Sequence, residues 1–185
     1  MEKKVVAFVD GENLVGRFQE MVQAGRKPRP DVVHRPDSFV WARDITTWSD
    51  MDLVRLIYYT SLVGSDGDVA EVTRLISTTM FVTRAGGFEG RAQIIPRVHK
   101  RLKNSRKSKV VDVDITIDVM RAVLQMPIEG VYLLTGDGDY LALVREIART
   151  TSKQVYLGAF SSGLAEPLKY NVEAFIDLDP IFFTG

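Results

Sequence analysis

The stretch VVAFVDGENL, at residues 5–14, decides the fold of this chain. Its first five residues are all apolar and mostly β-branched, which is typical of a strand buried on both faces of a parallel sheet. The apolar run stops at Asp10 and Gly11. One face of a helix is then predicted by the spacing of Leu14, Phe18, Met21 and Val22. The chain therefore opens with a central strand, a tight turn and a helix.

The same alternation continues along the chain. Further strands are predicted at residues 53–63, 131–134, 155–157 and 175–178. Helices are predicted at residues 162–170 and from two apolar stripes, which are Val69, Val72, Leu75 and Ile76, and Leu141, Val144, Ile147 and Ala148. Strands that alternate with helices favour parallel pairing and right-handed crossovers. The prediction is a three-layer, Rossmannoid α/β fold with a doubly wound, mainly parallel sheet, formed by a single domain over residues 1–185.

Three segments are less regular. Residues 25–50 contain three prolines and show no sustained period, so we expect an insertion or loop, in which Trp41 and Trp48 serve packing or an interface. Residues 81–98 are ambiguous, with a strand near residues 93–95. Residues 110–124 are predicted to be a helix with Asp112 as its N-cap. Its apolar face would consist of Val113, Ile117, Met120 and Leu124, although the alternation at residues 111–118 also fits a strand.

Composition narrows the chemistry. The chain of 185 residues has equal numbers of basic and acidic residues, no cysteine and only two histidines. Thiolate metal sites, disulfides, a cysteine nucleophile and a three-histidine site are therefore excluded, and any metal must be held mainly by oxygen. The first apolar run of the chain has only five residues, which is too short for a signal peptide. No apolar run is long enough to span a membrane. We expect a cytoplasmic protein with no membrane partner.

Acidic residues follow two of the predicted strands directly. Asp10 ends the first strand, and Asp137 and Asp139 come after the strand at residues 131–134. The carboxyl ends of parallel strands meet at one edge of the sheet, and Asp112, Asp114 or Asp118 on a neighbouring helix can face that edge. Carboxylates this close repel one another by roughly 1 to 4 kcal/mol per pair. A hard dication, Mg²⁺ or Mn²⁺, would offset the repulsion and could promote hydrolysis of a phosphodiester.

Three motifs together resemble the NYN domain family, a branch of the PIN-like nucleases, and especially its bacterial members. They are VVAFVDGENL at residues 5–14, KVVDVDITID at residues 109–118 and LLTGDGDY at residues 133–140. The resemblance covers most of the chain in the order of the family. Val110, Thr135 and Tyr140 stand where the family more often has Gly, Ser and Phe, and none of these departures removes a carboxylate.

The resemblance implies a PIN-like fold and a metal-dependent ribonuclease that hydrolyses RNA, single-stranded or structured. Carried over by position, Asn13 would help to fix the first-strand acid, and Asp118 would be the second acid of its motif. The metal ligands would be Asp10, Asp112, Asp137 and Asp139. Glu12 is a weaker candidate, because an acid in the first turn of a helix is also favoured by the helix dipole.

A basic run precedes the helix that carries Asp112. Seven of the thirteen residues from 97 to 109 are Lys or Arg and none is acidic: Arg97, Lys100, Arg101, Lys103, Arg106, Lys107 and Lys109. We expect them to contact RNA phosphates, which gives affinity without sequence preference. The alternative is an ordinary solvated surface. His99, inside the run, is expected at the surface rather than in catalysis.

Two rival functions remain open from the sequence. A phosphatase of the haloacid dehalogenase type also has an Asp after its first strand, but it needs a second Asp two residues later, where this chain has Glu12. A non-catalytic NYN module that binds RNA or protein as a regulator is compatible with the same motifs. Assembly into a homo-oligomer is left open as well.

Overall fold

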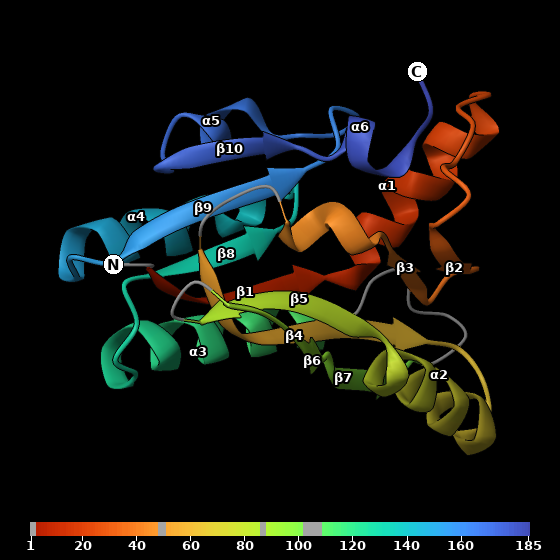
Figure 1. The fold of residues 1–185 in the computed structure, drawn as a ribbon, viewed down its shortest axis with the longest axis horizontal. Coiled ribbons are helices and arrows are strands. Elements are labelled where there is room, and N and C mark those ends of the chain that lie inside the picture. The colour runs from red at the N-terminus through yellow and green to blue at the C-terminus, as the bar shows by residue number, and fades with distance from the viewer. Residues whose placement is uncertain (1–2, 48–50, 86–87, 102–108) are drawn as a thin grey trace.

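The computed structural model describes residues 3–47, 51–85, 88–101 and 109–185. A six-stranded sheet forms its centre, in the order β10-β9-β8-β1-β4-β7, and neighbouring strands are paired in parallel. Figure 1 shows β1 in the middle of this sheet. The strands are β1 (Lys4–Asp10), β4 (Asp52–Leu62), β7 (Ile95–Lys100), β8 (Gly130–Leu134), β9 (Gln154–Ala159) and β10 (Ala174–Asp177).

Helices cover both faces of the sheet. They are α1 (Gly11–Gln23), α2 (Asp66–Thr78), α3 (Lys109–Gln125), α4 (Leu141–Thr150), α5 (Glu166–Lys169) and α6 (Asp179–Phe182), with short 3-10 helices η1 (Arg43–Thr46) and η2 (Gly138–Tyr140). The side chains of β1 alternate between two core clusters. Val5, Ala7 and Val9 pack with α1, α2 and α6, whereas Val6 and Phe8 pack with α3, α4 and α5. The predicted three-layer α/β fold is therefore confirmed.

The strand order reverses at β1. From β1 the chain moves outward through β4 and β7 on one side, and it then returns to β8, β9 and β10 on the other. In open parallel sheets, the crevice at such a reversal, beyond the carboxyl ends of the strands, is the usual place for a functional site. Asp10 ends β1, and the sequence Thr135-Gly136-Asp137 follows β8, so both acidic motifs lie at this point.

The segment at residues 25–50 is more ordered than the sequence indicates. It forms a two-stranded antiparallel sheet, β2 (Val33–Arg35) with β3 (Phe39–Trp41), followed by η1. Phe39, Trp41 and Ile45 are buried in the same core cluster as α1. The alternative of an irregular loop is therefore wrong for this part, because side chains without a helical or strand period still fill the core, and the alternative of an insertion stays a prediction. The packing role of Trp41 is confirmed, and Trp48 lies outside the described residues.

The ambiguous segment at residues 81–98 contains three strands. β5 (Met80–Ala85) and β6 (Phe88–Gln93) form an antiparallel pair, and β7 is the edge strand of the main sheet. The predicted strand near residues 93–95 thus spans the end of β6 and the beginning of β7. The helix predicted at residues 162–170 is reduced to α5, because its first residues form an irregular turn around Gly163, which has a φ of 75°.

Two predictions for α3 are wrong. The helix begins at Lys109, so Asp112 lies in its first turn and is not the N-cap. The core-facing residues are Val111, Ile115, Val119, Ala122 and Val123. Val113, Ile117 and Leu124, predicted to face the core, are 53%, 49% and 62% exposed. Both sets have helical spacing, and only packing against the sheet decides between them. Within the described residues, no helix is long and apolar enough to cross a membrane.

Candidate active site

The carboxyl end of β1 presents a buried acid. Asp10 is 3% exposed and caps α1, because its Oδ1 accepts a hydrogen bond of 3.0 Å from the backbone N–H of Asn13. Its Oδ2 accepts a second bond, of 3.0 Å, from the hydroxyl of Thr135. A Cβ at Gly11 would lie 2.3 Å from the ring of Tyr58, so the turn into α1 requires glycine for space. The carboxylate is therefore fixed in one orientation.

Asn13 and Thr135 connect the ends of β1 and β8. The side-chain oxygen of Asn13 accepts a hydrogen bond of 2.9 Å from the N–H of Gly136. The Thr135 hydroxyl, which donates to Asp10, accepts a bond of 3.1 Å from the N–H of Asp137. One buried hydroxyl thus joins the Asp10 carboxylate to the backbone of Asp137. The bond from Asn13 to Asp10 comes from its backbone N–H, whereas its side chain holds the loop after β8, so its role in fixing the first-strand acid stays a prediction.

Asp137 and Asp139 differ in their surroundings. Asp137 caps η2, since its Oδ1 accepts a hydrogen bond of 3.1 Å from the N–H of Asp139. Asp137 is half-buried beside the end of β8, whereas Asp139 is exposed. Of the two acids in this motif, Asp137 is the one tied to Asp10.

A buried phenol brings Asp112 into the same region. Tyr140 is 2% exposed, and its hydroxyl donates a hydrogen bond of 3.2 Å to Oδ1 of Asp112 on α3. Burial raises the pKa of Tyr140 far above its ordinary value, and the negative charges of Asp10, Asp112 and Asp137 raise that pKa further. Acids from β1, from α3 and from the loop after β8 therefore act on one hydroxyl group.

Asp118 has different neighbours from Asp112. Its Oδ2 accepts a hydrogen bond of 2.8 Å from the buried hydroxyl of Tyr59, and its Oδ1 accepts one of 2.7 Å from Arg121. Arg97 on β7 forms a longer ion pair with it, at 4.0 Å. Within the described part of the chain, this predicted acid thus contacts two cations and a phenol, and its hydrogen bonds and ion pairs are not with Asp10 or Asp137.

The basic run is partly neutralised where the structure describes it. Lys100 forms an ion pair of 2.7 Å with Asp66, and Arg97 pairs with Asp118. His99 is not simply a surface residue: its side chain is 28% exposed and its Nε2 lies 3.0 Å from Asp114. Lys109 is exposed at the start of α3. The predicted phosphate contacts Lys103, Arg106 and Lys107 lie outside the described residues.

Sequence reasoning treated Thr135 and Tyr140 only as departures from a family pattern, but the structure gives both a place in the site. Thr135 bridges Asp10 and Asp137, and Tyr140 binds Asp112. A signal was present in the sequence, because Thr135 comes two residues before Asp137 and Tyr140 comes directly after Asp139. What the sequence lacks is the position of α3, which decides that Tyr140 reaches Asp112.

The donor set fits a hydrated magnesium or manganese ion. Among the residues that the structure describes, no three histidine, aspartate or glutamate side chains are grouped closely enough to hold a metal by themselves. Mg²⁺ does not require such a cage, because it keeps several waters and is usually bound by one or two carboxylates together with substrate phosphates. Asp10, Asp137 and Asp112 offer oxygen ligands of this kind, and their joint effect on Tyr140 places negative charge where a dication would be favoured.

The fold and the position of the acids define a class of protein. It is the class of parallel α/β domains that carry acidic residues at the carboxyl ends of their central strands. The sequence profile of the NYN domain matches residues 4–179, nearly the whole chain. The chain therefore belongs to the NYN domain family, within the PIN-like nuclease superfamily, whose members typically use divalent metals.

Comparison with solved structures adds support for the fold. A protein of unknown function from Vibrio parahaemolyticus, VPA0982, has a crystal structure that matches with a TM-score of 0.62 and 16% sequence identity, over 99% of this chain and 97% of that one. At this identity the likeness concerns the fold alone. A comparison with curated proteins found no match.

Proposed function

We propose that this chain is a divalent-metal-dependent ribonuclease that hydrolyses phosphodiester bonds of RNA at the edge formed by Asp10, Asp112 and Asp137. Membership of a nuclease superfamily supports the reaction class. The observation that carries the proposal is the hydrogen-bond network that joins Asp10 to the backbone of Asp137 through Thr135 and holds Asp112 on the buried Tyr140 hydroxyl.

Each residue has a distinct role in this proposal. Asp10 would be the most rigid ligand, because Asn13 and Thr135 hold both of its oxygens. Asp137 and Asp112 would complete the metal site, with Asp139 at its exposed rim. Tyr140 stays protonated and orients Asp112 by its hydrogen bond. When bound, Mg²⁺ or Mn²⁺ would supply a Lewis acid for the phosphate and lower the pKa of the attacking water.

Asp118 has a separate role. Its pairs with Arg97 and Arg121 hold basic side chains at the flank of the site, where they can contact a phosphate of the strand. Lys109 adds an exposed positive charge at the beginning of α3. We therefore assign Asp118 to positioning and not to metal binding.

The test compares wild-type protein with Asp137→Asn on single-stranded RNA, with Mn²⁺ or with EDTA. We expect cleavage only with the metal, and a loss of at least about 100-fold in the variant, which corresponds to about 2.7 kcal/mol of transition-state stabilisation. Asn is as good an N-cap as Asp, so the variant should unfold at a similar urea concentration. Cleavage by Asp137→Asn at the wild-type rate would refute the assignment. Turnover of p-nitrophenyl phosphate with intact RNA would favour the phosphatase instead.

A further inference from the structure

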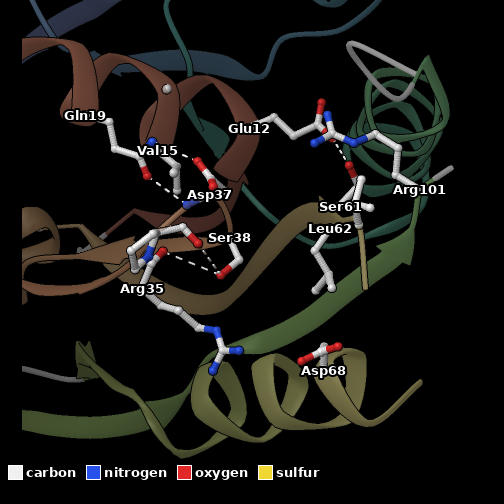
Figure 2. A pocket seen from close by; sticks show the side chains of 13 residues that line it. Glu12, Val15, Gln19, Arg35, Asp37, Ser38, Ser61, Leu62, Asp68 and Arg101 are labelled. Carbon is white, nitrogen blue, oxygen red and sulfur yellow. Dashed lines mark hydrogen bonds between the residues drawn. The ribbon is translucent and has the colours of Figure 1, made fainter. Parts of the chain in front are cut away.

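A cavity of about 480 Å³ lies beside the acidic edge, on the side of β4. Figure 2 shows its walls, which come from α1, the turn between β2 and β3, the end of β4, the first turn of α2 and Arg101 after β7. Its volume is within the range of about 300 to 1,000 Å³ that is typical of small-molecule sites. Glu12 in its wall comes two residues after Asp10, so the cavity adjoins the proposed cleavage site.

A glycine keeps this cavity open. Gly16 lies in the interior of α1, where glycine is a poor helix former. A Cβ at Gly16 would meet no atom within 4 Å, and its backbone does not have the positive φ that favours glycine. Neither packing nor conformation therefore requires glycine here. What a side chain at this position would change is the space in the cavity.

The mouth of the cavity is held in a rare backbone conformation. Asp37, in the turn between β2 and β3, has a φ of 58°, the one positive φ of a non-glycine residue in the described part of the chain. Gln19 on α1 fixes this conformation with two hydrogen bonds. The Nε2 of Gln19 donates to Oδ1 of Asp37 at 2.9 Å, and the N–H of Asp37 donates to Oε1 of Gln19 at 2.7 Å. Such conformations persist where surrounding contacts enforce them, and they are frequent at ligand sites.

The charges in the cavity favour a base over a phosphate. Three carboxylates line it, those of Glu12, Asp37 and Asp68, against the guanidinium groups of Arg35 and Arg101. Arg35 is also paired with Glu71 on α2. A phosphate would be repelled by the acids, whereas a carboxylate accepts hydrogen bonds from the amino group of a nucleobase.

The remaining walls suit a flat ring. Val15 and Leu62 give apolar surface, and a guanidinium such as that of Arg101 can stack on a base. We propose that this cavity binds one nucleobase with an exocyclic amino group, adenine or cytosine for example, from the single-stranded RNA whose phosphodiester lies at the acidic edge. The proposal rests on the proposed ribonuclease function for its substrate, and it makes base preference a property of α1 and the β2–β3 turn.

The test fills the cavity without touching the acidic edge. Gly16→Leu places a side chain in it, Gly16→Ala is the matched control, and Asp37→Asn removes a carboxylate with a residue that tolerates positive φ. Short adenylate, cytidylate and uridylate oligonucleotides are titrated with EDTA present, so that they stay intact, and binding is measured by fluorescence anisotropy. Cleavage with Mn²⁺ and hydrolysis of bis(p-nitrophenyl) phosphate, which has no base, are measured in parallel.

We expect wild-type protein and Gly16→Ala to bind adenylate and cytidylate strands about tenfold more tightly than uridylate strands. Gly16→Leu should lose about tenfold in affinity and the preference, yet hydrolyse bis(p-nitrophenyl) phosphate as wild type does. Asp37→Asn should lose the preference. Variants that bind and cut all strands as wild type does would overturn the cavity assignment and leave the ribonuclease intact. Preferential binding without any cleavage would refute the ribonuclease and support the cavity.

Discussion

Two tyrosine–aspartate pairs join α3 to the carboxyl end of the sheet, and they differ in the charges around them. Tyr140 donates to Asp112 beside Asp10 and Asp137, whereas Tyr59 donates to Asp118 beside Arg97 and Arg121. The local chemistry is the same in both pairs. The first pair lies among further acids, whereas the acids around the second pair, Asp118 and Asp114, are balanced by Arg97 and Arg121. An acid therefore becomes a candidate metal ligand through its neighbours, and not through its own type or its position on a helix.

Of the substitutions that test this comparison, Asp10→Asn should have the largest effect on RNA cleavage. It removes a negative charge from the Tyr140 side and leaves the Tyr59 side unchanged. We expect metal-dependent RNA cleavage to fall by at least about 100-fold, while the capping bond to Asn13 is kept because Asn also caps helices well. Cleavage rates and urea unfolding measure the two effects. An unchanged rate would remove Asp10 from the metal site.

Alkaline unfolding compares the two phenols directly. Burial first, and then the neighbouring acids, raises the pKa of Tyr140 in the folded state, and burial followed by Asp118 does the same for Tyr59. Tyrosine has a pKa of about 10 in the unfolded chain. The stabilisation is therefore complete below about pH 10 and falls as the pH rises above it, by at most about 1.4 kcal/mol per pH unit for each tyrosine.

Urea unfolding between pH 9 and pH 11, in steps that bracket the ordinary tyrosine pKa of about 10, measures that slope. Tyr140→Phe and Tyr59→Phe should each make it shallower. Tyr140→Phe should in addition change the concentration of Mn²⁺ needed for cleavage, because Asp112 loses its hydrogen bond, whereas Tyr59→Phe should not. Identical slopes in wild type and both variants would contradict the shared electrostatic origin of the shifts.

Asp118→Asn should have the smallest effect. The variant can still accept the hydrogen bond from Tyr59, and it loses only two partly exposed ion pairs, each worth about 0 to 1 kcal/mol. We expect cleavage to fall less than about tenfold, that is by less than about 1.4 kcal/mol. The loss should appear as a higher KM for RNA. It should be smaller at high salt, because salt already screens the contacts between the arginines and the RNA phosphates. A loss as large as that of Asp10→Asn would contradict the positioning role and place Asp118 in the metal site.

Much of the sheet could be predicted from the sequence. The apolar runs at residues 5–9 and 131–134 predict strands, and the central place predicted for the first is confirmed, because a strand covered on both faces must be apolar at each position. The secondary structure of residues 25–50 and 81–98 could not be predicted from the sequence, because short antiparallel strands with mixed side chains have no distinctive period. Their place in the core depends on contacts with α1 and β4, which are distant in sequence.

The sequence by itself determined five of the six strands of the sheet, the family, and the acids that end β1 and follow β8, since these depend on local patterns and motifs. The tertiary structure alone decided which face of α3 is buried, that Tyr140 meets Asp112 while Tyr59 meets Asp118, and that Gly16 faces a cavity. The physical reason is that α3 is apolar on two faces with equal helical spacing. Only packing against the sheet sets its rotation, and with it the neighbours of each acid.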